Sequence, residues 1–308
     1  MEKITVVGAG NVGATTAMRL AEAELAREVV LVDIKEGLPQ GTALDQWESA
    51  PVQGFDSRIA GTQGYEETAG SGLYVVTAGF PRKPGMSRSD LVTKNASVVE
   101  DISREIRTHS PGAVVIMVTN PLDVMAYVAK EVTGFPRERV VGMAGILDTA
   151  RFRSFIALEL DVSVEDVQAL VLGGHGDSMV PLVSTVSVGG VPLTELLDRT
   201  TIDDLVERTR QGGGEIVGLL KEGSAYYAPS AAVTQMCEAV VRDKKRVLPC
   251  AAWLEGEYGL EDLFLGVPVK LGDGGVEAVL EVDLSEGERR ALERSAADVR
   301  GTMDTVAV

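Results

Sequence analysis

The start of the chain constrains its fold most strongly, because an apolar run leads directly into a spaced set of glycines. Lys3–Val7 is predicted to be a strand, and Gly8-Ala9-Gly10-Asn11-Val12-Gly13 follows it immediately. Between a strand and a helix, the first glycine permits a tight turn and the second lets a pyrophosphate approach the backbone. The third lets the helix pack closely on the strand. The segment therefore predicts a dinucleotide-binding unit, with the phosphates at a helix N-terminus.

Alternating apolar strand patterns and helical patterns continue through the first half of the chain. The predicted strands are Lys3–Val7, Glu28–Val32, Leu73–Thr77, Val114–Val118 and Val140–Met143. The predicted helices between them are Val12–Ala23, Gly41–Ser49, Asp90–Thr108 and Asp123–Val132. Near-continuous apolar strands are typical of a parallel sheet buried on both faces. We therefore expect an α/β Rossmann domain with a doubly wound parallel sheet over residues 1–145.

Beyond about residue 145 the pattern changes, and an α+β substrate and catalytic domain is expected over residues 146–308. A helix is predicted at Thr149–Leu160, a strand at Asp166–Leu172, a hairpin turn at residues 271–276 and a terminal helix at Ser285–Val306. Between this strand and the hairpin, the sequence predicts only short elements. Two domains fit a chain of 308 residues.

An acidic residue at the end of the second strand indicates which dinucleotide is bound. Asp33 follows Gly13 by about 20 residues, where a carboxylate can accept hydrogen bonds from both ribose hydroxyls of NAD. The same carboxylate would repel the 2′-phosphate of NADP. The sequence therefore predicts NAD as the cofactor.

Charge and composition exclude several classes of partner. The formal net charge of −17 argues against a nucleic-acid partner, and it fits either a saline cytoplasm or ordinary solubility. No apolar run approaches the length of a membrane span, and the first residues enter a strand without a signal peptide, so a cytoplasmic protein is expected. The two cysteines, Cys237 and Cys250, lack metal-ligand spacing and are expected to be buried free thiols.

Three residues of the second half form a candidate proton relay beside an anion clamp. Asp148 and Arg151 are three apart at the start of the helix, and His175 follows an apolar strand in Gly173-Gly174-His175-Gly176. If Asp148 accepts a hydrogen bond from one ring nitrogen of His175, the other nitrogen can exchange a proton with substrate. Arg151 can hold a carboxylate with a bidentate fork. Alone, each residue also has an ordinary structural reading as a cap, a solvated helix residue or a turn histidine.

The loop after the third predicted strand gathers positive charge in an acidic chain. It carries Arg82 and Arg88 among glycines and prolines, so we expect a lid that binds an anion. A basic solvated loop is the ordinary alternative. Asn120 follows Val118 at the end of the fourth predicted strand, where its amide can orient ribose and substrate. His109, at a helix end, is expected to be a surface residue.

Several separated segments, in the same order, resemble the lactate/malate dehydrogenase family. They are the glycine segment at residues 8–13, Thr-Ala-Gly-Phe-Pro-Arg-Lys-Pro-Gly-Met-Ser-Arg at 77–88, Val-Thr-Asn-Pro-Leu-Asp at 118–123, Leu-Asp-Thr-Ala-Arg-Phe-Arg at 147–153 and Gly-Gly-His-Gly-Asp at 173–177. Nearly the whole chain fits. The resemblance implies a homo-oligomeric oxidoreductase, often a tetramer and sometimes a dimer, that works in the tricarboxylic acid cycle on a small dicarboxylate.

The resemblance also implies roles for individual residues. His175 would be the acid/base with Asp148 as its partner, Arg151 would hold the carboxylate beside the reacting carbon, and Arg88 would polarise the carbonyl oxygen. Asn120 would help to bind substrate and Asn95 the cofactor. The family position at Arg82 sets specificity, and lactate dehydrogenases resemble this loop but carry glutamine there. An arginine can pair with the second carboxylate of malate or oxaloacetate, whereas the methyl of pyruvate would leave it unpaired.

Two other readings stay open from the sequence. A lactate dehydrogenase would share most of these residues and differ at Arg82. A catalytically silent NAD-sensing module would need the glycine segment and Asp33 but would have no use for His175 and Asp148.

Overall fold

One nine-stranded sheet runs through the protein and carries residues from both halves of the chain. The computed structural model describes residues 1–81 and 88–306, without the side chains of residues 88 and 89. Across the sheet the strand order is β14-β13-β12-β6-β5-β4-β1-β2-β3. The run from β6 to β3 is parallel and reverses its direction of winding between β1 and β4, as in a Rossmann fold.

The first half alternates strands and helices along the chain. Its strands are β1 (Lys3–Val7), β2 (Glu28–Val32), β3 (Arg58–Thr62), β4 (Leu73–Val76), β5 (Val114–Met117) and β6 (Val140–Gly142). Its helices are α1 (Asn11–Glu22), α2 (Leu38–Glu48), α3 (Ala50–Gln53), α4 (Arg88–His109) and α5 (Leu122–Thr133), with 3-10 turns η1 (Glu66–Thr68) and η2 (Arg137–Arg139).

The second half adds long helices, short strand pairs and a long hairpin. Its helices are α6 (Gly145–Leu160), α7 (Leu193–Leu196), α8 (Arg199–Leu220), α9 (Tyr227–Val241) and α10 (Glu286–Met303), with 3-10 turns η3 (Val183–Thr185) and η4 (Glu257–Gly259). Its strands are β7 (Val167–Gln168), β8 (Val171–Leu172), β9 (Val180–Pro181), β10 (Ser187–Val188), β11 (Val191–Pro192), β12 (Arg246–Glu255), β13 (Glu261–Gly272) and β14 (Gly275–Val279).

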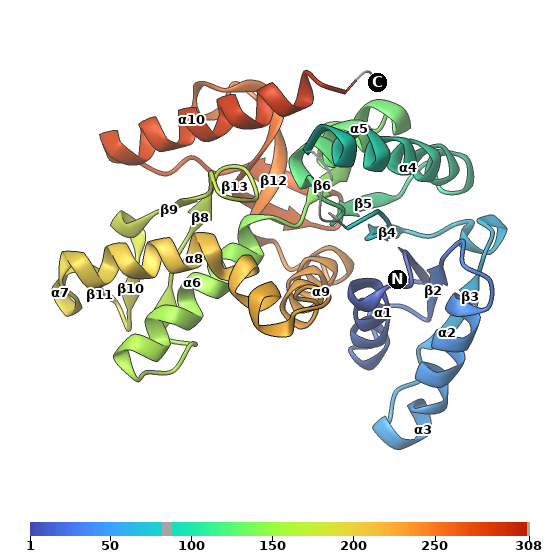
Figure 1. Ribbon diagram of the computed structural model, residues 1–308. Coiled ribbons are helices and arrows are strands. Elements are labelled where there is room, and N and C mark those ends of the chain that lie inside the picture. The colour runs from blue at the N-terminus through green and yellow to red at the C-terminus, as the bar shows by residue number, and fades with distance from the viewer. Residues whose placement is uncertain (82–87, 307–308) are drawn as a thin grey trace.

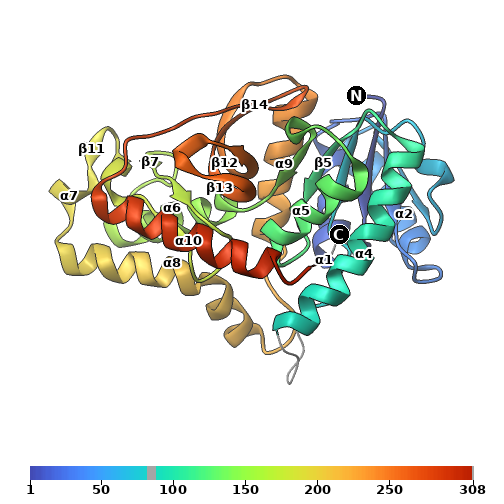
Figure 2. The same ribbon diagram turned by 90° about the horizontal axis from the view of Figure 1, so that it is seen from above.

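Helices cover both faces of the sheet, which confirms the doubly wound α/β prediction. Helices α4 and α5 pack together on one face and α10 extends that layer, while α1 packs against α9 on the other (Figures 1 and 2). The parallel strands β4 and β5 are buried throughout, as their continuous apolar sequences require. The largest hydrophobic core contains residues of both halves, among them Ile116 and Phe264.

The junction between the halves contains a strand pairing that the sequence did not predict. Strand β12 pairs antiparallel with β6 through Ala251 and Gly142, so the β12–β13–β14 hairpins extend the parallel sheet. A Cβ atom at Gly142 would lie 2.9 Å from the Cβ of Ala251, so glycine permits this pairing. The predicted hairpin turn is confirmed, because Gly272 pairs with Gly275 across it.

Several further elements differ from the sequence-based prediction. Edge strand β3 was not predicted, because its sequence Arg-Ile-Ala-Gly-Thr contains a single large apolar residue. The single strand predicted at Asp166–Leu172 is instead β7 and β8, which belong to different small sheets. Helix α8 is one element of 22 residues, although the prediction gave only short segments there. Three consecutive glycines in its interior weaken the helical pattern.

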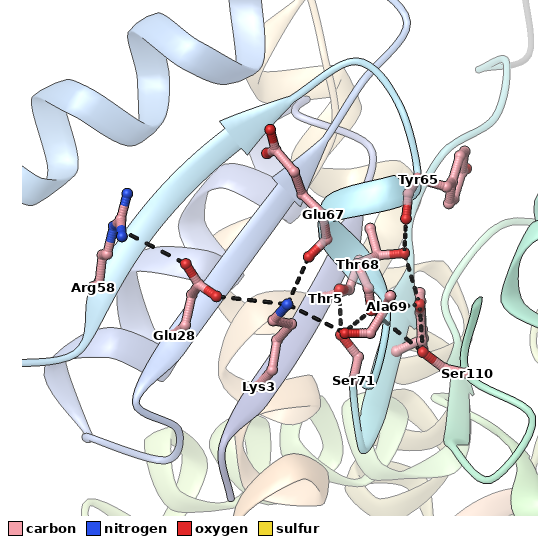
Figure 3. Close-up of polar contacts among 11 residues, drawn as sticks. Lys3, Thr5, Glu28, Arg58, Tyr65, Glu67, Thr68, Ala69, Ser71 and Ser110 are labelled. Carbon is pink, nitrogen blue, oxygen red and sulfur yellow. Dashed lines mark hydrogen bonds and ion pairs between the residues drawn. The ribbon is translucent and has the colours of Figure 1, made fainter.

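A hydrogen-bonded cluster closes the edge of the sheet formed by the amino ends of the parallel strands (Figure 3). The Lys3 ammonium donates to the carbonyl oxygens of Glu67 and Ala69 and lies 3.6 Å from Glu28. The hydroxyls of Thr5 and Ser71 are 2.7 Å apart and buried. These contacts fasten the turn η1 to the strands at the edge remote from the glycine loop. Within residues 1–81 and 88–306, no helix is both long and apolar enough to cross a membrane.

Candidate active site

The opposite edge of the sheet, at the carboxyl ends of β1, β4 and β5, opens into a cavity of about 510 Å³. Ligands of open α/β sheets bind at this edge, where the strand order reverses. The cavity is lined from the first half by Val12, Asn95, Val118 and Asn120, and from the second by Leu147, Arg151, His175 and Arg210. Residues that the sequence placed in two separate predicted sites therefore share one cavity.

The glycine loop has the shape that a dinucleotide pyrophosphate requires. Gly8 has φ +104°, and a Cβ atom on Gly13 would lie 1.8 Å from the carbonyl oxygen of Gly8, so neither position accepts a side chain. At Gly10 a Cβ atom would have no neighbour within 4 Å, so the space beside the start of α1 is open. Backbone N–H groups at a helix N-terminus favour a bound phosphate. The loop of this chain therefore fits NAD.

Asp33 lies beside this loop and stabilises it. One carboxylate oxygen accepts a hydrogen bond from the backbone N–H of Ala9 at 2.7 Å, and the other accepts from that of Lys35 at 2.9 Å. A carboxylate oxygen can accept more than one hydrogen bond, so Asp33 retains capacity for ribose hydroxyls. Its position at the end of β2 fits the cofactor preference expected from the sequence.

His175, Asp148 and Arg151 form a linked, largely buried group. The His175 Nδ1 atom is 2.8 Å from one carboxylate oxygen of Asp148, and the other oxygen is 3.1 Å from Nη1 of Arg151. The Asp148 side chain is 2% exposed, against 15% for His175 and 14% for Arg151. Asp148 and Arg151 lie one turn apart on the same side of α6, and Arg151 lines the cavity. The sequence-based pairing of Asp148 with His175 is thus present in the structure.

The charges around His175 favour its protonated form. Burial acts to lower the pKa of His175, but the charge and hydrogen bond of Asp148, together with the charge of Asp123, outweigh it. The pKa of His175 is therefore raised above its usual value, even though Arg151 opposes the shift. A histidine poised in this way can donate a proton at neutral pH.

The backbone of the His175 loop is held by residues to which the sequence assigned no role. The N–H of Gly174 donates to the buried Ser295 hydroxyl on α10 at 2.8 Å, and the N–H of His175 donates to Asp123 on α5 at 2.9 Å. Asp123 belongs to the Val118–Asp123 segment noted in the sequence, whereas Ser295 carries no recognisable signal. Both side chains stabilise the position from which the imidazole reaches the cavity.

The side-chain amide of Asn95 is hydrogen-bonded to the main chain of two loops. Its side-chain oxygen accepts from the N–H of Phe80, and its amide nitrogen donates to the carbonyl oxygens of Phe80 and Asn120. Asn95 therefore joins the loops that follow β4 and β5 while it lines the cavity. Asn120 is exposed at the cavity wall, as expected from its place after β5.

The predicted anion-binding loop is the part of the site that the structure leaves undescribed. Arg82 lies outside the described residues, and Arg88 is described only as the first residue of α4. Among described residues, Arg210 on α8 adds a positive charge that the sequence analysis did not identify. The adjacent glycines of α8 make room for the clamp, because a Cβ atom at Gly212 would lie 3.1 Å from Cδ of Arg151.

This arrangement can carry out a defined kind of chemistry. A substrate carboxylate can pair with Arg151, and a carbonyl or hydroxyl oxygen can face Nε2 of His175. Val12, in the segment of the glycine loop, lines the same cavity, so a dinucleotide bound at the loop can reach it. These are the groups needed to move a proton while a hydride moves to or from a carbon atom.

Comparisons with known proteins agree with this geometry. Residues 2–142 match the NAD binding domain of lactate/malate dehydrogenase, and residues 146–307 match the alpha/beta C-terminal domain of the same family. A malate dehydrogenase of Chloroherpeton thalassium is 60% identical over 99% of this chain and 98% of its own length. The crystal structure of malate dehydrogenase from Salinibacter ruber is 55% identical, with a TM-score of 0.95 over 98% of this chain and 97% of that one. A lactate dehydrogenase of Cryptosporidium parvum, complexed with lactic acid and the dinucleotide, is 42% identical with a TM-score of 0.95 over 98% and 97% of the two chains.

Proposed function

The chain belongs to the lactate/malate dehydrogenase family, and from that premise we propose that it is an NAD-dependent malate dehydrogenase. The observation that carries the proposal is the 2.8 Å pair of His175 and Asp148 beside Arg151, in the cavity that the glycine loop borders. The relatives named malate dehydrogenase, at 55–60% identity over nearly the full chain, support malate and oxaloacetate as the substrates.

We infer the following roles for the chain's own residues. Asp148 holds His175 with Nδ1 protonated, so Nε2 donates a proton to the oxygen of oxaloacetate, or removes one from the hydroxyl of malate. Arg151 binds the carboxylate next to the reacting carbon. Arg88 polarises the oxygen and Arg82 pairs with the second carboxylate, as the family resemblance of their loop implies.

The NAD site is proposed to be built from the first half of the chain. Gly8, Gly10, Asn11, Val12 and Gly13 form the turn and helix start that receive the pyrophosphate, and Asp33 receives the ribose. When bound, the nicotinamide supplies or accepts the hydride. Val118, Asn120 and Asn95 line the wall of the same cavity, which supports their assignment to the cofactor site, with Asn120 also facing substrate.

Replacing the acid/base tests this mechanism. We expect His175→Asn to lower kcat for oxaloacetate reduction by several orders of magnitude, with the Kd for NADH kept within a few-fold of the original, because the cofactor contacts are untouched. NADH fluorescence titration and stopped-flow kinetics measure the two quantities. Near-normal turnover in His175→Asn would remove His175 from the mechanism. NADH binding without turnover of any 2-oxo acid by the unaltered protein would favour an NAD-sensing module.

A lactate dehydrogenase is the second candidate, because the Cryptosporidium parvum enzyme is nearly superimposable on this chain. The two candidates share the His175 relay and differ in the substrate group that meets Arg82. Comparison of oxaloacetate with pyruvate therefore separates them.

We also propose the organisation of the molecule and its assembly. Residues 1–145 form the NAD-binding domain and 146–308 the catalytic domain, a division supported by the ends of the two family matches. The exposed side chains of Leu44, Trp47 and Val52 support a homo-oligomer, a tetramer or a dimer, since association would cover them. Light scattering coupled to size-exclusion chromatography would report a monomer if this is wrong.

The location and pathway are proposed on simpler grounds. Two buried, unpaired cysteines support a reducing compartment such as the cytoplasm. Interconversion of malate and oxaloacetate supports a place in the tricarboxylic acid cycle. Fractionation of cells and the growth defect of a deletion strain would test these two statements.

A further inference from the structure

Asp123 is a buried acid beside His175 that the proposed mechanism does not use. Asp123 is the second residue of α5 and is 5% exposed. One of its carboxylate oxygens accepts a hydrogen bond from the backbone N–H of His175 at 2.9 Å. Its other oxygen is buried without a hydrogen-bond partner among the described residues. Burying a carboxylate in this way is costly, so it calls for an explanation.

Asp123 borders a different cavity from the one that contains Arg151. Asp123 and His175 both line a second cavity of about 620 Å³ between α4, α5 and α10, whereas Asp123 does not border the cavity that contains Arg151. The loop contributes His175 and Asp177 to this space, and α10 contributes Asp298. Helix α4 contributes the apolar Leu91 and Val92.

Charges on α6 also act on this pair of residues. Asp148 lies 2.8 Å from Nδ1 of His175, and its other carboxylate oxygen lies 3.1 Å from Nη1 of Arg151. Burial raises the pKa of Asp123 to about 6, although the backbone hydrogen bond and the charge of His175 lower it. The carboxylate is therefore ionised above about pH 6, the range in which a histidine with a raised pKa titrates.

We propose that Asp123 is a positioning residue for His175, which fixes the backbone of the catalytic loop and adds negative charge that stabilises the imidazolium. The proposal rests on the proposed role of His175 as the acid/base. Asp148 acts on the ring and Asp123 on the main chain, so the two carboxylates restrain the histidine from both ends. Ser295 provides a third restraint through Gly174, but a neutral one.

Three variants separate charge from position. Asp123→Asn keeps an oxygen that can accept the His175 N–H and removes the charge. Ser295→Ala removes a neighbouring backbone hydrogen bond and leaves every charge in place. Asp298→Asn removes an exposed charge from the rim of the same cavity without touching the loop bonds.

Histidine NMR gives a readout that does not depend on turnover. The chain has two histidines, so ¹³Cε1-histidine labelling gives two signals, and His109→Gln assigns them. Asp123→Asn should shift the His175 titration midpoint to lower pH by about half a unit, because a nearby charge in a partly buried site is worth roughly that much or more. Ser295→Ala and Asp298→Asn should leave the midpoint within about 0.1 to 0.2 units.

Kinetics should follow the same pattern in the full-length enzyme. In Asp123→Asn the fall in oxaloacetate kcat/KM with rising pH should move to lower pH with the NMR midpoint, whereas Ser295→Ala should lower kcat several-fold without moving the profile. An unshifted His175 midpoint in a folded Asp123→Asn variant overturns the proposal, as does an equal shift in Asp298→Asn.

The unaltered protein provides a test if Asp123→Asn fails to fold. The His175 signal should then follow a two-step titration, with a minor inflection near pH 6 from Asp123. A single-site curve throughout would contradict the proposal. If the unaltered protein shows the two-step titration but has no activity with any substrate, the result would instead count against the proposed function.

Discussion

Replacing Asp148 by asparagine isolates the contribution of its charge to the proton relay. The side chain is 2% exposed, and its carboxylate lies between Nδ1 of His175 at 2.8 Å and Nη1 of Arg151 at 3.1 Å. An asparagine keeps the shape and one acceptor oxygen but not the charge. A hydrogen bond to a charged group contributes about 1.5–3 kcal/mol, so the oxaloacetate kcat/KM should fall roughly 10- to 100-fold at pH 7.

The pH profile distinguishes loss of charge from loss of orientation. Asp148 raises the pKa of His175, and oxaloacetate reduction needs the imidazolium, so activity is present below that pKa and is lost as pH rises through it. Without the charge, this loss should begin at lower pH. The acid limb of malate oxidation, which needs neutral imidazole, should move in the same direction. Steady-state kinetics from pH 5 to 9, with the NADH Kd as control, measure both limbs. A lower rate with unmoved limbs would refute the electrostatic reasoning.

Three further predictions concern the cofactor, the anion clamp and the thiols. Asp33→Ser should weaken NADH binding about tenfold or more and reduce the preference for NADH over NADPH, because it removes a charge and the hydrogen bonds to the backbone of Ala9 and Lys35. Equal use of both cofactors by the unaltered enzyme would count against this role. Arg151→Ala should lower kcat/KM by about 100-fold or more for oxaloacetate and pyruvate alike, and a loss confined to one substrate would place Arg151 elsewhere. Burial raises the pKa of both Cys237 and Cys250, so a thiol reagent such as DTNB should label neither in the native protein, and rapid labelling would contradict their buried positions.

The Rossmann half of the fold was predictable because its signals are local. Strands buried on both faces, such as β5, read as short apolar runs, and the glycine loop specifies its own turn. Edge strand β3 has one side of its backbone free of a partner strand and needs fewer apolar residues, so its sequence resembles a loop. The pairing of β12 with β6 depends on contact between distant segments, which no local pattern records.

The site was predictable where residue types have few alternative uses. The pair of His175 and Asp148 was expected because a histidine beside a carboxylate suits proton transfer. In the structure, Nδ1 of His175 and a carboxylate oxygen of Asp148 lie within hydrogen-bonding distance. Asp123 at a helix start reads as an ordinary first-turn acid, and only its burial against the His175 backbone distinguishes it. The hydrogen bonds of the Asn95 amide to the main chain of Phe80 and Asn120 could not be predicted either, because they join loops that are distant in the sequence.

The choice of dicarboxylate substrate is the central claim, and a comparison of two ketoacids tests it most directly. NADH oxidation should be measured with oxaloacetate and with pyruvate at equal concentrations, for the unaltered enzyme and for Arg82→Gln. We expect a strong preference for oxaloacetate. Arg82→Gln should lower kcat/KM for oxaloacetate by about 100-fold or more, because breaking one desolvated charge pair costs roughly 3–5 kcal/mol. The same substitution should raise kcat/KM for pyruvate. A preference for pyruvate, or a substrate ratio unchanged in Arg82→Gln, would contradict the account.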